Sequence, residues 1–273
     1  MSSSLLAGRV ALVTGASRGI GAAVARALGA HGASVAVNYL RSAEAAARVV
    51  ADIEKSGGRA VAVAGDASDL AQVRAMVATA TAELGTPDVL VCNVMVGADR
   101  IGAKAGAARA GAKAGTPGGS FIDTPDGIAS VRDAVASQLD ATLACCHAVI
   151  PGMRRAGGGS IVLIGASTTH NPYPVPVEIA AAKSAQDAVG RSLARELAPD
   201  NIRVNTLAPG FVPTDANAGP FQATLIAHTA EATPLPNPIT PEDVADAVVL
   251  LTSDLSTKIT GTFVPLDGGR TLI

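Results

Sequence analysis

One glycine-rich stretch, Thr14–Gly21, restricts the possible folds of this chain more than any other feature. It follows a short apolar run, Val10–Val13, and it opens an alanine-rich segment with the composition of a helix. Gly15 permits a tight turn, while Gly19 and Gly21 let backbone amides approach a phosphate at the positive end of that helix. Strand, glycine turn and helix in this order predict a dinucleotide-binding unit. The spacing, G-x-x-x-G-x-G, differs from the general G-x-G-x-x-G pattern, so an ordinary glycine-rich turn is the alternative.

Short apolar runs and longer alanine-rich segments alternate along the rest of the chain. Most of the runs are apolar throughout, which is typical of parallel strands covered on both faces. The alternation predicts an α/β fold, a Rossmann-type doubly wound parallel sheet in a single domain of residues 1–273. The expected strands are Arg9–Val13, Ser34–Asn38, Arg59–Val63, Asp88–Cys92, Ser160–Ile164, Ile202–Thr206 and Thr262–Leu266.

Two stretches break this alternation. Residues 96–125 are rich in Ala and Gly, and Lys104–Ala107 and Lys113–Gly115 resemble a slipped duplication. Residues 213–238 contain five prolines and no clear strand. Both stretches follow the carboxyl ends of expected strands, where open α/β sheets bind their ligands. We therefore expect an inserted loop at about 96–125 and a substrate lid at about 211–238.

Composition excludes several classes of protein. A formal net charge of −2 over 273 residues provides no general attraction to nucleic acid or to an anionic membrane. Three cysteines, two of them adjacent, form neither a disulfide framework nor a metal-ligand spacing. The amino terminus lacks a basic segment followed by a long apolar run. We therefore expect a soluble cytoplasmic protein with no metal and no nucleic-acid or membrane partner.

The end of the second expected strand predicts the type of dinucleotide. A carboxylate at that place would accept a hydrogen bond from the ribose of NAD, whereas a cation would favour the 2′-phosphate of NADP. The sequence there is Asn38-Tyr39-Leu40-Arg41, without a carboxylate, and Arg18 lies in the glycine loop. Two guanidinium groups beside the adenosine ribose favour NADP(H). The alternative is that both arginines are simply solvated.

Seven motifs, spread almost from end to end, resemble those of the short-chain dehydrogenase/reductase family. In chain order they are Thr14–Gly21, Gly65–Asp69, Asp88–Asn93, Ala182-Lys183, Asn201–Asn205, Pro209–Thr214 and Asp267–Gly269. The resemblance implies a seven-stranded Rossmann sheet and a homo-oligomer, either a tetramer or a dimer. Thr262–Gly269 resembles the last strand and turn, which pack across a two-fold axis in tetramers of the family.

The same resemblance assigns residues to the cofactor. Asp66 would meet the adenine, Asn93 and Val94 would line the cofactor trough, and residues 209–214 would contact the nicotinamide carboxamide. Lys183 would hold the nicotinamide ribose. The residues that we expect at the cofactor are Gly15, Ser17, Arg18, Gly19, Ile20, Gly21, Asn38, Tyr39, Arg41, Asp66, Ala67, Asn93, Lys183, Pro209, Gly210, Val212 and Thr214.

The catalytic positions depart from the family, which reduces carbonyls with a Ser, a Tyr and a Lys supported by an Asn. Lys183 is present, but Ile179 stands four residues earlier, where the Tyr would share the helix face. Ala166 falls at the Ser position and Gln138 at the Asn position. Because a general acid contributes roughly 10²–10⁴-fold to a rate, ketone reduction requires another proton donor here.

Candidates for the missing groups lie between Ala166 and Lys183. Ser167 is one place beyond the family's Ser position. Tyr173 stands among three prolines in residues 171–176, which stiffen the backbone around it. We expect Tyr173 to donate a proton or a hydrogen bond to the substrate, the alternative being that its ring packs under the lid. His170 is a weaker candidate for the same role. The expected catalytic set is therefore Lys183, Tyr173 and Ser167, with no metal.

Three functions are compatible with these residues. The favoured one is NADPH-dependent reduction of the C=C bond of an α,β-unsaturated acyl thioester, because the resulting enolate needs hydrogen-bond donors rather than an acid at the alkoxide position. The thioester carrier would be coenzyme A or an acyl carrier protein, whose phosphates could meet the cations of residues 96–125, unless that segment is only a solvated loop. The second function is reduction of a bulky apolar or secondary-metabolite ketone with a displaced proton donor. The third is non-catalytic NADP(H) binding. The cations in question are Arg100, Lys104, Arg109 and Lys113.

Overall fold

The computed structural model of the chain describes residues 4–95, 126–171, 176–215, 218 and 222–272. The loop expected at about 96–125 and the candidate Tyr173 lie outside these ranges.

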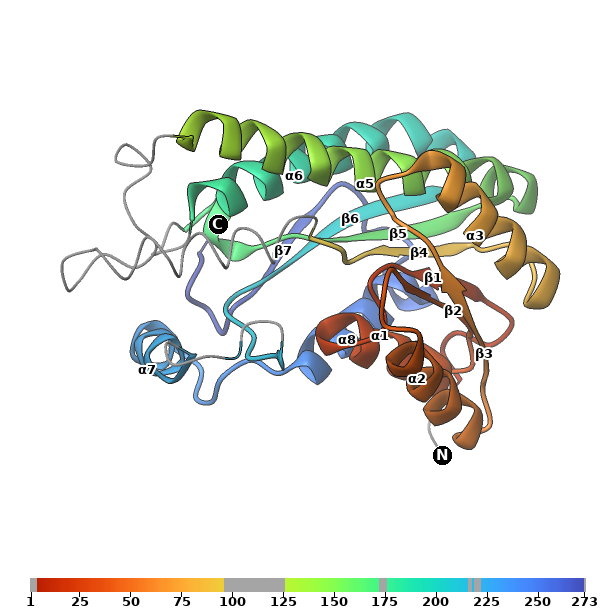
Figure 1. Cartoon of the computed structure of the whole chain (residues 1–273), viewed down its shortest axis with the longest axis horizontal. Helices are drawn as coiled ribbons and strands as arrows, with labels where there is room; N and C mark the ends of the chain where they lie inside the picture. Colours follow the sequence, from red (N-terminus) through yellow and green to blue (C-terminus); the bar gives the residue numbers. More distant parts are fainter. Residues whose placement is uncertain (1–3, 96–125, 172–175, 216–217, 219–221, 273) are drawn as a thin grey trace.

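A sheet of seven parallel strands forms the centre of the structure, in the order β3-β2-β1-β4-β5-β6-β7 (Figure 1). The predicted doubly wound α/β fold is therefore confirmed, and each predicted strand is present with ends that differ by one to three residues. Strand β6 shows the largest difference, since it continues three residues beyond Thr206. The strands are β1 (Val10–Val13), β2 (Ser34–Tyr39), β3 (Arg59–Ala64), β4 (Val89–Cys92), β5 (Gly159–Ile164), β6 (Ile202–Pro209) and β7 (Phe263–Leu266).

Helices cover both faces of the sheet. In Figure 1, α1 (Gly19–Ala30), α2 (Ala43–Lys55) and α8 (Pro241–Thr252) lie below it, and α3 (Leu70–Glu83), α5 (Gly127–Ala156) and α6 (Val177–Leu197) lie above it. Each layer encloses its own buried apolar cluster. Successive residues of a strand point to opposite faces of the sheet and therefore pack into opposite clusters. Val13 packs with α1 and α8, whereas Leu12 packs with α3 and α5. Burial on both faces explains why apolar residues predominate in these strands.

Local capping fixes where two of the helices begin. The Asp69 carboxylate accepts hydrogen bonds from the backbone N–H groups of Ala71 and Gln72 at the start of α3. At the start of α8, Thr240 and Asp243 exchange bonds between side chain and backbone in a capping box. Short 3₁₀ turns complete the connections: η2 (Ser167–Thr169), η3 (Ala198–Asp200) and η5 (Asp254–Ser256).

The predicted lid contains a helix that the sequence analysis did not foresee. Helix α7 (Gln222–Ala232) stands apart from the two helical layers, beside the loop that follows β6 (Figure 1). The prolines at either side of this segment suggested a loop throughout, yet the segment between them has no proline. The region is therefore a short helix carried by two loops.

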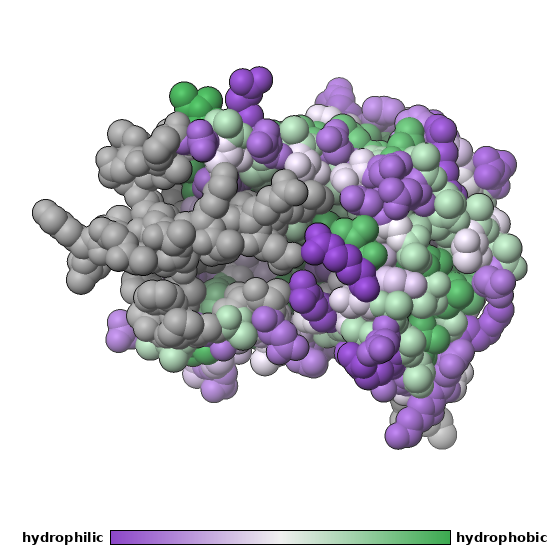
Figure 2. All heavy atoms as spheres, in the orientation of Figure 1, coloured by the Kyte–Doolittle hydropathy of each residue, from purple (hydrophilic) through white to green (hydrophobic). Residues whose placement is uncertain are grey.

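The described part of the face in Figure 2 shows hydrophilic and hydrophobic residues interspersed. Within the described ranges, no helix has both the length and the apolar character needed to cross a membrane.

Candidate cofactor and active site

The glycine loop lies where the strand order of the sheet reverses. Strand β1 pairs with β2 on one side and with β4 on the other, so the chain leaves the neighbouring ends of β1 and β4 in opposite directions. Thr14 follows β1 and Asn93 follows β4. The Asn93 backbone N–H donates to Thr14 Oγ1 at 2.9 Å, and Asn93 Nδ2 donates to the Thr14 carbonyl at 3.0 Å. Ligands of open α/β sheets bind at such a switch point.

The backbone of the loop is packed so closely that three of its positions require glycine. Gly15 and Gly19 have φ angles of 61° and 54°, in the region that side chains disfavour. A Cβ on Gly21 would lie 2.4 Å from the carbonyl oxygen of Gly15 and 2.6 Å from Asn93 Nδ2. A Cβ on Gly19 would lie 3.4 Å from Thr214 Cγ2, which brings the loop after β6 next to the glycine loop. The predicted residues Gly15, Gly19, Gly21, Asn93 and Thr214 therefore lie together.

Asn38, at the end of β2, supports this loop from behind. Its side chain is 2% exposed, and its Oδ1 accepts from the backbone N–H of Gly15 at 3.1 Å. Its Nδ2 donates to the carbonyl oxygens of Val63 and Gly65 at 3.2 and 3.0 Å. The amide that we expected at the cofactor is thus bonded to the backbone of two neighbouring segments, the glycine loop and the end of β3.

A groove of about 580 Å³ opens beside the glycine loop, between α1 and α2. Arg26 in this groove pairs with Asp52 at 2.8 Å, whereas Arg18 and Arg48 form no ion pair within the described ranges. Arg41 is exposed nearby on the loop between β2 and α2. Three arginines and two aspartates line the groove, so its charge next to the loop is net positive. Its lining residues are Ser17, Arg18, Gly19, Ala22, Arg26, Ser42, Ala45, Arg48, Ala51, Asp52 and Asp215.

The remaining predicted cofactor residues lie in the glycine loop and the first turn of α1, or at and just beyond the ends of β2, β3 and β6. Asp66 Oδ1 accepts hydrogen bonds from the backbone and hydroxyl of Ser68 at 2.9 and 2.7 Å. Gly210 lies so near the C-terminal turn that a Cβ on it would be 3.0 Å from the Cβ of Asp267. Buried members of the set are Ala67, Pro209 and Val212, and partly exposed ones are Ser17, Ile20 and Tyr39.

Lys183, the one residue that the resemblance matches to the family's catalytic set, is buried. Its side chain is 4% exposed, and its Nζ donates to the Ile164 carbonyl at 2.7 Å and to Gln186 Oε1 at 3.1 Å. Removal from water disfavours the ammonium form and lowers the pKa of Lys183 to about 8. Gln186 was not among the predicted site residues. Its place three residues after Lys183, on the same face of a helix, could have indicated the contact.

The other catalytic positions carry no acid. Ile179 lies in the first turn of α6, partly buried, and Ala166 precedes η2. Ser167 is the first residue of η2 and is 1% exposed. Gln138 is also buried, and its Nε2 donates to the Val94 carbonyl at 3.1 Å.

His170, the weaker candidate, packs its ring against Phe263 with centroids 4.1 Å apart. Among the described residues, therefore, Lys183 and Ser167 are the predicted catalytic groups that lie near the carboxyl end of β5.

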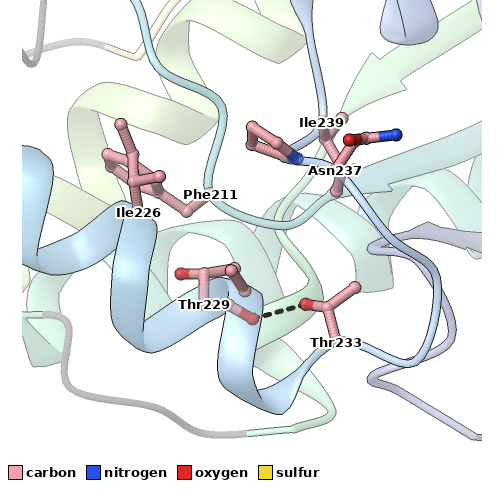
Figure 3. A pocket seen from close by; sticks show the side chains of 8 residues that line it. Phe211, Ile226, Thr229, Thr233, Asn237 and Ile239 are labelled. Carbon is pink, nitrogen blue, oxygen red and sulfur yellow. Dashed lines mark hydrogen bonds between the residues drawn. The ribbon is translucent and has the colours of Figure 1, made fainter.

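Helix α7 closes over a small apolar pocket (Figure 3). Phe211 from the loop after β6 faces Ile226 of α7, and the Thr233 hydroxyl donates to the Thr229 carbonyl at 2.6 Å. The pocket has a volume of about 10 Å³, room for no more than one water molecule. It is consequently a packing contact of α7 with Phe211 and with residues 237–239. Its walls are Phe211, Ile226, Thr229, Ala230, Thr233, Asn237, Pro238 and Ile239.

Metal ligands are not gathered in the part of the chain that the structure describes. No group of three or more His, Cys, Asp or Glu residues there could hold an ion.

Known proteins resemble this chain over almost its whole length. The profile of the family described as "Enoyl-(Acyl carrier protein) reductase" matches residues 15–271. The 3-oxoacyl-acyl-carrier-protein reductase FabG of Chlamydia muridarum is 33% identical over 267 residues, covering 97% of this chain and 98% of that protein.

Two solved structures are similar to this chain in both sequence and fold. A short-chain dehydrogenase from Burkholderia cenocepacia J2315 in complex with NADP superimposes with a TM-score of 0.79 and 32% identity, covering 97% of this chain and 98% of that one. A 7α-hydroxysteroid dehydrogenase in complex with NADH and 7-oxo glycochenodeoxycholic acid superimposes with a TM-score of 0.81 and 30% identity. The match covers 98% of this chain and 97% of that one.

Proposed function

This chain belongs to the short-chain dehydrogenase/reductase family of oxidoreductases, and we propose that it uses NADPH to reduce the C=C bond of an α,β-unsaturated acyl thioester. One observation carries the proposal. Lys183 keeps a buried place at the end of β5, whereas Ile179 occupies the position from which the family's tyrosine protonates an alkoxide. The description of the matching family as an enoyl reductase agrees with it.

The preference for NADP(H) over NAD(H) is also a proposal. The loop at the end of β1 has the glycines that a pyrophosphate needs, and the groove beside it presents Arg18, which forms no ion pair with any residue that the structure describes. The end of β2 and the residues after it, Asn38–Arg41, carry no carboxylate, and a carboxylate there would repel the 2′-phosphate. Both cofactor types occur among the structural relatives, so the arginines provide the argument.

The side chains of the site suit a reaction that passes through an enolate. When bound, NADPH supplies the hydride that adds to the β-carbon of the substrate. The Lys183 ammonium, held in a medium of low dielectric constant, would grip the ribose and place positive potential near the thioester. Ser167 is the hydroxyl nearest in sequence to the Ile164 carbonyl that holds Lys183, and it is our candidate donor to the thioester oxygen. The α-carbon would take its proton from water or from Tyr173, which stays a prediction.

Ketone reduction is the second candidate. The relatives favour it, because the names of FabG and of the hydroxysteroid dehydrogenase refer to 3-oxoacyl and hydroxysteroid substrates. It requires a displaced acid, for which Tyr173 is the candidate, and a bulky apolar substrate under the lid formed by residues 211–238. Non-catalytic binding of NADP(H) is the third candidate. Following the resemblance at residues 262–269, we also propose a homo-oligomer.

Matched substrates separate the three candidates. Purified protein is mixed with NADPH and with pairs of enoyl- and 3-ketoacyl-thioesters of the same acyl chain, and NADPH oxidation is followed by absorbance. Turnover of the enoyl member only supports our proposal. Turnover of the ketone only overturns it, and loss of that activity in Tyr173→Phe would assign the acid. NADPH binding without oxidation in either reaction would establish the non-catalytic alternative.

A further inference from the structure

A chain of buried polar side chains links Lys183 to α5. Gln186, which is 0% exposed, accepts from Lys183 through Oε1 and donates through Nε2 to Thr142 Oγ1 at 3.2 Å. The Thr142 hydroxyl in turn donates to the Gln138 carbonyl at 2.9 Å. The chain therefore runs from the lysine to the helix that carries Gln138, whose own side chain bonds to Val94 in the expected cofactor trough.

The network determines which way the Gln186 amide points. A threonine hydroxyl has a single proton, and Thr142 gives that proton to the Gln138 carbonyl. Thr142 can therefore only accept from Gln186, which requires the amide nitrogen on that side and the amide oxygen on the side of Lys183. An ammonium donates and never accepts, so the same orientation satisfies Lys183.

The charge of Lys183 is balanced by neutral acceptors only, within the ranges that the structure describes. On its own helix, Glu178 accepts a hydrogen bond from Ser130 of α5, and Asp187 is paired with Arg191. The third titratable group near Lys183 is the Cys92 thiol at the end of β4.

This thiol remains protonated near neutral pH. Hydrogen bonds with Cys145 and Cys146 of α5, and then burial, raise the pKa of Cys92 well above its ordinary value. Burial outweighs the opposing electrostatic effect of Cys92, and the pKa of Lys183 therefore falls to about 8.

We propose that Gln186 is a positioning residue that fixes the place of the Lys183 ammonium and sets how readily it loses its proton, so that cofactor affinity falls as the pH rises through the titration of this lysine. The inference rests on the proposed function in one respect, that NADPH is the ligand. An amide in this position supplies one neutral acceptor, and exchanging it for a carboxylate or a thioether changes the electrostatics with little change in side-chain size. Such substitutions should therefore move the titration in opposite directions.

Two variants and two readouts test this. The dissociation constant of NADPH is measured by the quenching or enhancement of its fluorescence from about pH 6 to 10 in the wild type, Gln186→Glu and Gln186→Met. The titration of the Lys183 amine is followed in parallel, without cofactor, by NMR of the labelled ammonium. We expect Gln186→Glu to move both midpoints upward by about one pH unit or more and Gln186→Met to move them downward by a similar amount. Ser192→Ala, on the exposed side of α6, is the matched control and should move neither.

Several outcomes decide between the inference and its premise. Identical midpoints in the three proteins would overturn the inference, because a structural role alone lowers thermal stability without moving a titration. Shifts of the amine titration in a protein that binds no NADPH at any pH would uphold the role of Gln186 and contradict the proposed cofactor. Should Gln186→Met not fold, Thr142→Val removes only the partner that orients the amide. A midpoint unchanged in that variant and in Gln186→Glu would then also overturn the inference.

Discussion

The side-chain oxygen of Asn38 accepts a hydrogen bond from the backbone N–H of Gly15 at 3.1 Å, so the end of β2 holds the first turn of the glycine loop. The backbone carbonyl of Asn38 accepts a second bond from Ala16 at 2.7 Å. Asn38, at the end of β2, therefore has a structural role towards the loop.

Replacing Asn38 with Asp should destabilise the protein. The carboxylate would still accept from Gly15, but it could not donate to Val63 and Gly65, and it would bury a charge. We expect a loss of about 2–4 kcal/mol in the free energy of unfolding, measured by urea denaturation. The control is Asn201→Asp at an exposed turn, where the loss should stay below about 1 kcal/mol. Equal losses in both variants would contradict the buttressing role of Asn38.

Gly21→Ala should weaken cofactor binding more than it affects the fold. The added methyl would lie 2.4 Å from the Gly15 carbonyl, which is backbone and can move only if the loop opens. We expect the dissociation constant of NADPH, measured by titration calorimetry, to rise by about tenfold or more. A tenfold rise corresponds to a loss of roughly 1.4 kcal/mol in binding free energy. Ala30→Gly at the far end of α1 serves as the control. An unchanged affinity in Gly21→Ala would show that the loop does not hold the dinucleotide.

Arg18→Ala should weaken NADPH binding without weakening NADH binding. Arg18 presents its guanidinium in the groove beside the glycine loop, and only NADPH carries a 2′-phosphate. We expect the dissociation constant of NADPH, divided by that of NADH, to rise by about tenfold in Arg18→Ala. The same ratio should not change in the control Arg132→Ala, on the exposed surface of α5. Parallel losses for both cofactors would point to a role of Arg18 at the pyrophosphate instead.

The stability of the protein should depend on the protonation of Lys183. The pKa of this lysine is about 8 in the folded protein against an ordinary value of 10.5, so between these values the unfolded chain binds the extra proton. Stability from this group consequently rises with pH between about 8 and 10.5, and the full penalty of the buried charge applies below that window.

The Lys183→Met variant isolates this effect, because every other titration cancels in the difference between two proteins. The unfolding free energy of the wild type minus that of the variant should increase with pH by up to about 1.4 kcal/mol per pH unit inside the window. It should be flat below pH 7. A difference that does not vary with pH would mean that the lysine is not buried as an ammonium.

The sequence determined most of the fold and the departures at the catalytic positions. Apolar runs separated by helical segments are local patterns, and burial of a parallel sheet on both faces leaves them visible along the chain. The glycines of residues 14–21 were equally readable, since a positive φ or a close backbone approach demands glycine wherever it occurs. Ile179 in place of the family's Tyr is a matter of residue identity and needs no structure.

Tertiary structure decided the roles of Asn38, Gln186 and α7. Asn38 was predicted from its place after β2, but its bonds go to β3 and to the glycine loop, and these partners are distant in the sequence. Gln186 joins Lys183 to α5 by hydrogen bonds only because α6 packs against α5 and places Thr142 beside it. The physical reason is the same in each case: a polar group becomes buried together with partners from other elements, and no local periodicity records which partners those are.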